Sequence, residues 1–259
     1  MTILQAVILS IVEGLTEFLP ISSTAHLIIT TKILNLDQND FVKLFEIVIQ
    51  SGAMLAIILL YTKKLWQNKD LIKYLTASFM PTAFFGLILY SILKKYLFQA
   101  DIMIAVNLIS VGAVFIIVEK MIKKKNIKLI LNLKDMNLRW AFLIGIAQSF
   151  AIFPGVSRAG AVILAMLILG YKRKPAVEYS FLLAVPTILS AGAYDLYKTS
   201  QTLFLSKQEV FLITLGCIVS AITAFAAVKW LLKFLQSHTL EIFGWYRILA
   251  GIIYLMLIL

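Results

Sequence analysis

Residues 17–26 read Glu17-Phe-Leu-Pro20-Ile-Ser-Ser-Thr-Ala-His26, and they interrupt an otherwise apolar stretch over about 2–34. A second apolar stretch, about 139–171, is interrupted by Ile152-Phe-Pro154-Gly-Val-Ser-Arg158-Ala-Gly160. Proline removes a helical hydrogen bond, and a broken backbone is tolerated at membrane depth only where it is buried in protein or lines a wet cavity. We therefore expect both breaks to lie inside a membrane protein and to mark its functional region.

The composition of the whole chain agrees with a membrane protein and excludes a soluble one. Of the 259 residues, 61% are hydrophobic and 14% are charged, and the mean hydropathy is +0.93. A soluble globule of this size needs a polar shell, which so few polar side chains cannot build. Six further apolar runs are long enough, or nearly so, to cross a bilayer: about 45–61, 74–93, 102–119, 179–194, 210–228 and 242–259.

The two interrupted stretches resemble copies of one unit. When Pro20 is aligned with Pro154, Ser23 is also matched with Ser157. Each interrupted stretch is followed by three of the apolar runs. We therefore predict an all-α polytopic integral membrane protein with a single membrane domain over 1–259, built from two repeats at about 1–125 and 135–259.

The distribution of basic residues predicts how the broken segments sit in the membrane. If each segment dips in and returns, one face carries 16 Lys and Arg and the other carries 6, whereas a single crossing per segment splits them 13 to 9. The positive-inside rule states that loops rich in Lys and Arg stay in the cytoplasm. The more uneven split therefore favours re-entrant helix pairs, with both termini outside the cytoplasm. Each repeat then crosses the membrane three times, and because this number is odd, the second repeat has the opposite orientation in the membrane to the first. Such inverted repeats occur in many transporters. The more basic face comprises the loops at 62–73, 120–139, 172–174 and 229–233, and the other face those at 32–43, 94–95 and 198–207.

The net charge of +11 does not indicate a nucleic-acid partner. The basic residues gather in short segments between apolar runs, for example at 120–125 and 172–174. Such clusters orient a membrane protein and bind anionic lipid headgroups. We therefore expect membrane lipids, and no nucleic acid, among its partners.

Two glutamates precede the first break. Glu13 and Glu17 are four residues apart and hence neighbours on one face of a helix. Carboxylates in an apolar segment are costly, so we expect both to face the protein interior or a wet cavity. The pair is suited to chelating a divalent cation, to holding one member protonated as an acid, or to making interhelical hydrogen bonds.

Hydroxyl groups and an imidazole follow the same break. Ser22, Ser23 and Thr24 restart the helix, where a hydroxyl caps free N–H groups and the helix N-terminus attracts anions. For Ser22, capping alone is as good an interpretation as phosphate binding. Ser23 and His26 are three residues apart on one helix face, and a hydroxyl within reach of an imidazole is the arrangement for nucleophilic catalysis.

The second break carries complementary groups. Gly155 and Gly160 let the backbone approach a ligand closely, and Ser157 can donate to an oxyanion at a helix start. Arg158 is a charge in the middle of an apolar stretch, so it needs an anionic partner, and its planar fork suits phosphate. The alternative is a purely structural ion pair between Arg158 and Glu13 or Glu17.

The other polar residues in apolar segments are weaker candidates. We expect Arg247 to extend to the outer face or to pair with an acid. Neither Cys217 nor His238 has metal-ligand spacing. Four residues lie at or near the ends of spans, where a capping or interfacial role is at least as good an interpretation: Glu46, Gln50, Glu178 and Asp195.

The segment Glu13-Gly-Leu-Thr-Glu17-Phe-Leu-Pro-Ile-Ser-Ser-Thr-Ala-His26 resembles the first signature of the undecaprenyl-diphosphate phosphatase (bacitracin-resistance) family of bacterial inner-membrane enzymes. Pro154-Gly-Val-Ser-Arg-Ala-Gly160 resembles its second signature, and the segments 45–52 and 178–186 are similar to further family segments. The resemblance therefore spans most of the chain. The sequence departs from the second signature at Ala159 and Val162, where the family carries hydroxyl residues.

The resemblance implies hydrolysis of undecaprenyl diphosphate to undecaprenyl phosphate and inorganic phosphate, which recycles the lipid carrier of cell-wall synthesis and confers bacitracin resistance. It implies a multi-pass homodimer in the bacterial plasma membrane, an active site toward the outer face, and a divalent cation (Mg or Ca), with Glu13 and Glu17 as its expected ligands. A non-enzymatic carrier of a polyprenyl phosphate or another anion is the alternative function. The nucleophile is Ser23, His26 or water. Catalysis is assigned to Glu13, Glu17, Ser23, His26 and Arg158, and phosphate binding to Ser22, Thr24, Gly155, Ser157 and Arg158.

Overall fold

The computed structural model of the chain describes residues 1–96, 101–199 and 205–258. Within these residues every named secondary-structure element is a helix. Two pairs of shorter helices, α1 (Ile3–Thr16) with α2 (Ser23–Ile33) and α6 (Leu138–Ser149) with α7 (Arg158–Ile168), occupy the interrupted stretches. Six described helices are long and apolar enough to cross a bilayer: α3 (Asp40–Gln67), α4 (Lys69–Tyr96), α5 (Asp101–Lys123), α8 (Arg173–Thr199), α9 (Lys207–Phe234) and α10 (Glu241–Ile258). The predicted all-helical polytopic membrane fold is confirmed.

Several of the long helices extend beyond the predicted apolar runs because capping side chains start them early. The side chain of Asn39 accepts a hydrogen bond from the Val42 N–H at 2.9 Å, so α3 begins ahead of its apolar residues. Ser206 and Glu209 form a reciprocal capping box at the start of α9. Residue 259 of the predicted last span, and 200–204 of the loop at 198–207, lie outside the described residues.

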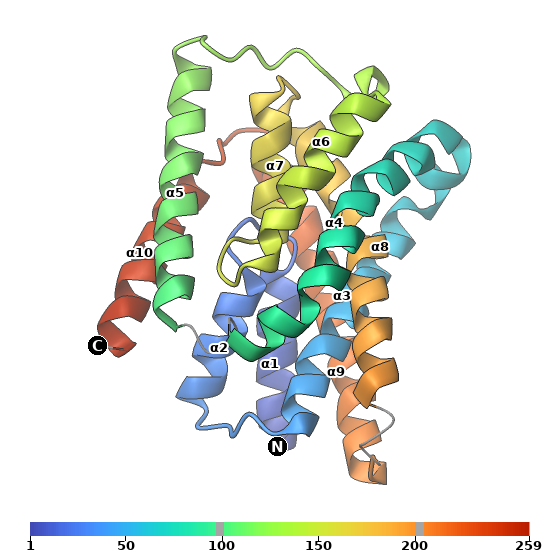
Figure 1. The fold of residues 1–259 in the computed structure, drawn as a ribbon, viewed down its shortest axis with the longest axis vertical. Helices are drawn as coiled ribbons and strands as arrows, with labels where there is room; N and C mark the ends of the chain where they lie inside the picture. The colour runs from blue at the N-terminus through green and yellow to red at the C-terminus, as the bar shows by residue number, and fades with distance from the viewer. Residues whose placement is uncertain (97–100, 200–204, 259) are drawn as a thin grey trace.

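Both interrupted stretches turn back toward the end from which they came. In Figure 1 the chain rises along α1 from the lower end and descends again along α2, and it descends along α6 from the upper end and rises again along α7, with the two connecting turns near mid-height. The two turns are close in space: Arg247 donates hydrogen bonds to the Pro20 carbonyl of the first turn and to the Gly155 carbonyl of the second. Each pair therefore returns toward its own end of the molecule, and the insertion of these pairs into the bilayer as re-entrant elements stays a prediction.

Each turn ends at a serine whose backbone is in the left-handed region. Ser22 has φ 72° and Ser157 has φ 75°, a conformation that costs free energy for any residue other than glycine. Each serine caps the helix that follows it, because its hydroxyl oxygen accepts a hydrogen bond from the N–H three residues later. By their capping role, Ser22 and Ser157 are therefore the equivalent positions of the two repeats. Alignment on the prolines instead matches Ser23 with Ser157, because the second turn has one residue more between its proline and its capping serine.

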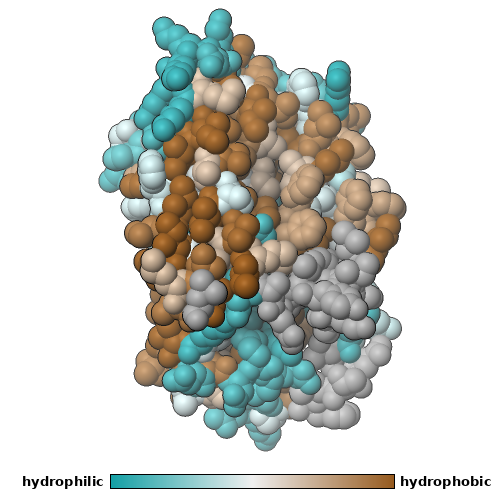
Figure 2. Space-filling view, turned by 60° about the vertical axis from the view of Figure 1, so that its left-hand side comes forward, coloured by the Kyte–Doolittle hydropathy of each residue, from teal (hydrophilic) through white to brown (hydrophobic). Residues whose placement is uncertain are grey.

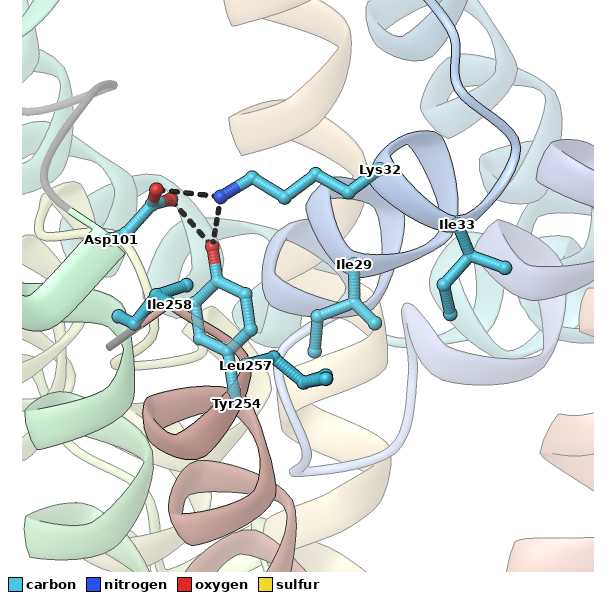
Figure 3. Close-up of a pocket in the computed structure, with 7 residues that line it drawn as sticks. All are labelled: Ile29, Lys32, Ile33, Asp101, Tyr254, Leu257 and Ile258. Atoms are coloured by element: carbon cyan, nitrogen blue, oxygen red, sulfur yellow. Dashed lines mark hydrogen bonds and ion pairs between the residues drawn. The ribbon is translucent and has the colours of Figure 1, made fainter.

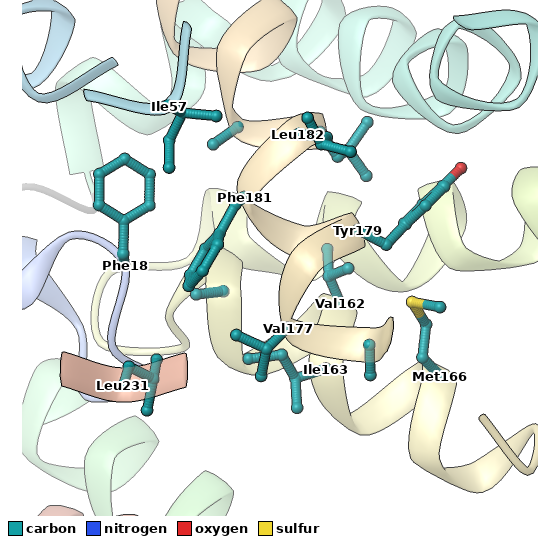
Figure 4. Close-up of a cluster of buried hydrophobic side chains, with 14 of the residues drawn as sticks. Phe18, Ile57, Val162, Ile163, Met166, Val177, Tyr179, Phe181, Leu182 and Leu231 are labelled. Atoms are coloured by element: carbon teal, nitrogen blue, oxygen red, sulfur yellow. The ribbon is translucent and has the colours of Figure 1, made fainter. Parts of the chain in front are cut away.

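Close helix contacts hold the first helix of each pair in place. A Cβ atom on Gly14 of α1 would lie 2.5 Å from the Ser220 carbonyl oxygen of α9, and one on Gly145 of α6 would lie 2.2 Å from the Ser78 carbonyl oxygen of α4. The turn after α1 is also anchored by Phe18, whose ring meets that of Phe181 edge to face at 5.3 Å (Figure 4). The turns thus lie on a packed core rather than in loose loops.

The outer surface has the pattern of a membrane-spanning protein. Figure 2 shows a hydrophobic band between hydrophilic regions near the two ends of the molecule. Large apolar side chains of the long helices are exposed, among them Leu59 of α3 and Ile222 of α9. The basic loop at 120–139 lies at the upper end of Figure 1, and both termini lie in its lower part.

Candidate active site

The meeting of the two turns brings Glu17 and Arg158 together across 141 residues of sequence. Glu17 ends α1 and Arg158 begins α7. Arg158 Nη2 donates a hydrogen bond to Glu17 Oε1 at 3.2 Å, and Arg158 Nη1 donates to the Ser180 carbonyl of α8 at 2.8 Å. Both charged side chains are largely buried, at 10% and 7% exposed. The anionic partner required for Arg158 is therefore Glu17.

The second oxygen of Glu17 holds the hydroxyl of Ser23. Ser23 is the first residue of α2, and its Oγ donates a hydrogen bond to Glu17 Oε2 at 2.5 Å. Hydrogen bonds between a hydroxyl and a carboxylate are short and strong, and they draw the proton toward the carboxylate. Glu17 thus joins a hydroxyl from the first turn to a guanidinium from the second, and is placed to accept the hydroxyl proton.

His26 has partners other than Ser23. Its Nδ1 lies 2.8 Å from the Ser22 carbonyl, so Nδ1 carries the proton, because a carbonyl can only accept. Its Nε2 lies 2.6 Å from the Tyr246 hydroxyl of α10, and the two rings are stacked. Among the hydrogen bonds of the described residues, none joins Ser23 to His26. The spacing placed both residues near one face of α2, but Glu17 takes the hydroxyl that the imidazole was expected to bind.

Glu13 lies one turn before Glu17 and is fully buried. Neither of its carboxylate oxygens has a hydrogen-bond partner among the described residues, and the same holds for Arg158 Nε and Ser180 Oγ. Buried polar atoms are nearly always paired in folded proteins. These unpaired atoms therefore leave capacity for a polar ligand, with acceptors on the Glu13 side and donors on the Arg158 side.

The residues predicted to bind phosphate are divided between capping and packing roles. Ser22 and Ser157 cap α2 and α7, and Thr24 is half-buried next to Ser23. Gly155 has φ +91°, and a Cβ atom there would lie 2.7 Å from the Ile104 carbonyl oxygen, so the turn needs glycine in order to pack against α5. The two cap positions also direct helix N-termini toward the space between the turns, where an anion is favoured.

The two departures from the second signature lie in the apolar core. Ala159 is 1% exposed and Val162 is 0% exposed, and both belong to the main hydrophobic cluster. Figure 4 shows Val162 among apolar side chains of α7 and α8. The contacts among Glu17, Ser23 and Arg158 are therefore made without hydroxyl groups at these two positions.

Arg247 of α10 is the residue that sequence reasoning misplaced. It is 0% exposed, and none of the ion pairs among the described residues includes it, so the expectation that it extends to the outer face or pairs with an acid is wrong. It donates instead to four backbone carbonyls at 2.7 to 3.2 Å, those of Pro20, Asn107, Gly155 and Val156. The carbonyls of Pro20, Gly155 and Val156 need donors because the turns interrupt the helical hydrogen bonding, whereas that of Asn107 lies within α5. The signal in the sequence was an arginine inside an apolar span, the same signal that singled out Arg158.

Two of the weaker candidates contact residues other than Glu17, Ser23 and Arg158. Glu46 accepts a hydrogen bond from Gln38 Nε2 at 3.1 Å. Glu178 forms an ion pair with Lys64. A capping or interfacial role stays at least as good an interpretation for both residues.

Comparisons with known proteins show a family to which the whole chain is similar. The model of the family described as bacitracin resistance protein BacA matches residues 6–253. A protein of Aquifex aeolicus named undecaprenyl-diphosphatase is 45% identical over 254 residues, covering 98% of each chain. Proteins of the same name from Campylobacter hominis and Persephonella marina are 44% and 45% identical and cover 100% of each chain.

Proposed function

This chain belongs to the bacitracin resistance protein BacA family, and on that basis we propose that Glu17, Ser23 and Arg158 form the centre of an undecaprenyl-diphosphatase. The reaction is hydrolysis of undecaprenyl diphosphate to undecaprenyl phosphate and inorganic phosphate. The observation that carries the proposal is the buried Glu17 carboxylate, which holds a serine hydroxyl on one oxygen and an arginine on the other. The unpaired oxygens of Glu13 beside it support a polar ligand in the same place.

Each group has a role that its contacts support. Arg158 and the N–H groups at the starts of α2 and α7 bind the diphosphate, since a guanidinium and helix N-termini both favour phosphate oxygens. Ser23 Oγ attacks the terminal phosphorus as Glu17 accepts the hydroxyl proton. The bond from that phosphorus to the bridging oxygen breaks and releases undecaprenyl phosphate. Water then cleaves the phosphoserine, with Glu17 returning the proton to Ser23.

A divalent cation, Mg or Ca, fits the Glu13–Glu17 pair. Glu13 has two buried oxygens with no partner among the described residues, and cations of this class prefer oxygen ligands. Within the described ranges no group of three His, Cys, Asp or Glu gathers, so the remaining ligands would be diphosphate oxygens and water. When bound, such a cation neutralises negative charge that develops on the phosphate oxygens.

The purified protein in detergent is expected to release inorganic phosphate from undecaprenyl diphosphate in the presence of Mg or Ca. A chelator should lower release by at least about tenfold, and added cation should restore it, because unneutralised carboxylates repel the substrate. Phosphate release over time measures both effects. The alternative, a non-enzymatic carrier of a polyprenyl phosphate or another anion, predicts no release under any condition, and that result would contradict the proposed function.

Ser23→Ala is expected to lower kcat by at least about 10²-fold, because binding and charge stabilisation alone remain once a nucleophile is removed. Ser10→Ala is the matched control, since the buried Ser10 hydroxyl of α1 only donates to the Ala6 carbonyl, at 2.7 Å. Its kcat should equal that of the unchanged protein. If Ser23→Ala turns over normally, the nucleophile is His26 or water. His26→Ala then distinguishes them, because it abolishes turnover if His26 is the nucleophile and leaves turnover in place if water is.

The orientation and assembly of the enzyme are part of the same proposal. We place the multi-pass protein in the bacterial plasma membrane with both termini and the active site toward the outer face. The basic loops at the end opposite the termini support this orientation. A homodimer is supported by the family resemblance of the sequence.

A further inference from the structure

A surface groove runs between α2 and α10, from the end of α2 toward the active site. Its outer part has a volume of about 390 Å³ and is lined by Lys32, Asp101 and Tyr254 among apolar side chains. Its inner part has a volume of about 220 Å³ and is lined by apolar side chains and by His26 and Tyr246. Three residues line both parts, so the two are one continuous α2–α10 groove: Ile29, Tyr254 and Leu257.

The outer mouth of the α2–α10 groove carries an exposed cation. Lys32 Nζ donates to Asp101 Oδ2 at 2.5 Å and to the Tyr254 hydroxyl at 3.1 Å, and Figure 3 shows these three polar groups converging. The side chains of Lys32 and Asp101 are 48% and 36% exposed. Ion pairs this exposed contribute little to stability, so an anion with more charge than one carboxylate can displace Asp101 from Lys32.

The inner end of the groove lies at His26, close in sequence to the catalytic groups but not lined by them. His26, one turn after Ser23 on α2, lines the inner part. Glu17, Ser23 and Arg158 line neither part, and all three side chains are largely buried. The groove is therefore a way toward the catalytic groups rather than their own pocket.

The wall of the groove that faces the lipid is apolar. Leu249 and Leu257 of α10 are 59% and 67% exposed, and Ile253 between them is also exposed. A prenyl chain can lie against these side chains while its headgroup follows the polar ones. A multiply charged headgroup cannot cross hydrocarbon without such partners, because an uncompensated charge in the membrane core is costly.

We propose that the α2–α10 groove is the route by which the diphosphate headgroup moves from the outer membrane surface to the active site, and that Lys32 is its first binding site. Asp101 holds Lys32 in place when no headgroup is bound and competes with the headgroup for it. The proposal rests on the proposed function and adds to it the path of the substrate. The loops predicted on the less basic face, at 32–43, 94–95 and 198–207, carry only six Lys and Arg, and Lys32 is one of them. Lys32 is therefore not part of a strongly basic face.

Lys32→Met tests the first binding site. With undecaprenyl diphosphate in detergent, KM is expected to rise about tenfold while kcat stays within about twofold, because a charge-assisted hydrogen bond is lost only outside the catalytic centre. Lys32→Arg, which keeps the charge, should retain the KM of the unchanged protein. Asp101→Asn should lower KM, because it removes the group that competes for Lys32.

The matched control is Lys123→Met. Lys123 forms an exposed ion pair with Glu241 at 2.6 Å, between α5 and α10 at the opposite end of the same helices, and its loss should change neither KM nor kcat. An unchanged KM in Lys32→Met would overturn the proposed route. A KM that rises in Asp101→Asn as it does in Lys32→Met would also overturn it, because that result is expected if Lys32 and Asp101 form a purely structural ion pair. If the unchanged protein releases no phosphate, the proposed function itself fails, which is distinguishable from failure of the route alone.

Discussion

Arg158→Ala is expected to abolish phosphate release from undecaprenyl diphosphate, with a loss in kcat/KM of at least about 10³-fold. Arg158 supplies the guanidinium that pairs with Glu17 Oε1, and its Nε has no hydrogen-bond partner among the described residues. Without it, the diphosphate loses its bidentate donor, and two neighbouring carboxylates repel the substrate. The measurement is phosphate release by the variant purified from membranes.

The variant should still fold and insert. Glu17 keeps its hydrogen bond from Ser23, and the packing of the turn against Phe181 through Phe18 is unchanged. Arg158→Lys keeps a positive charge without the planar fork, and should retain part of the activity. Arg139→Ala is the control, because Arg139 lies over the Trp140 ring at the basic end and away from the site. Normal turnover by Arg158→Ala would remove the phosphate-binding role.

Arg247→Met is expected to destabilise the protein as well as inactivate it. Arg247 serves four carbonyls, from both turns and from α5, and the loss of its side chain leaves these buried acceptors without a donor. Breaking a buried charged network of this kind lowers the free energy of unfolding by about 3–5 kcal/mol. Thermal unfolding in detergent should therefore show a much lower Tm, together with little or no phosphate release.

The two arginines are distinguished by comparing these measurements. Both variants break buried contacts and should lower Tm. Activity is therefore compared at a temperature below the unfolding transition of each variant, where folded Arg158→Ala protein should still release no phosphate. Arg247→Lys should be intermediate in stability, since one ammonium has three donors for four carbonyls in different directions. An Arg247→Met protein that melts at the normal temperature would show that the turns are held together without this side chain.

Much of the site could be predicted because its residues lie beside local breaks in an otherwise apolar sequence. Pro20 and Pro154 mark those breaks, and the charges of Glu17 and Arg158 next to them are too costly in a membrane to be incidental. The helix-restarting role of Ser22 and Ser157 also follows from local capping rules. These inferences depend on neighbours within a few residues, which the sequence displays directly.

The partners of these residues could not be predicted in the same way. Ser23 and His26 share a face of α2, so spacing alone favoured their pairing, yet Ser23 binds Glu17 across the turn. His26 instead reaches Tyr246, 220 residues later in the chain. Arg247 carried the same signal as Arg158, but nothing near it in the sequence indicated that two distant turns and α5 would supply its four carbonyls.

The order of amino acids alone therefore established a polytopic helical membrane protein with two broken segments and charged groups placed on them. Solvent preference and local backbone chemistry suffice for this, because a bilayer leaves few alternatives to helices and tolerates breaks only where they are sheltered. Packing of the folded chain set which atoms meet, including Glu17 with Arg158 and Ser23, and Arg247 with both turns. Those contacts join segments more than a hundred residues apart or depend on the shape of a turn, and only the assembled helices bring them within hydrogen-bonding distance.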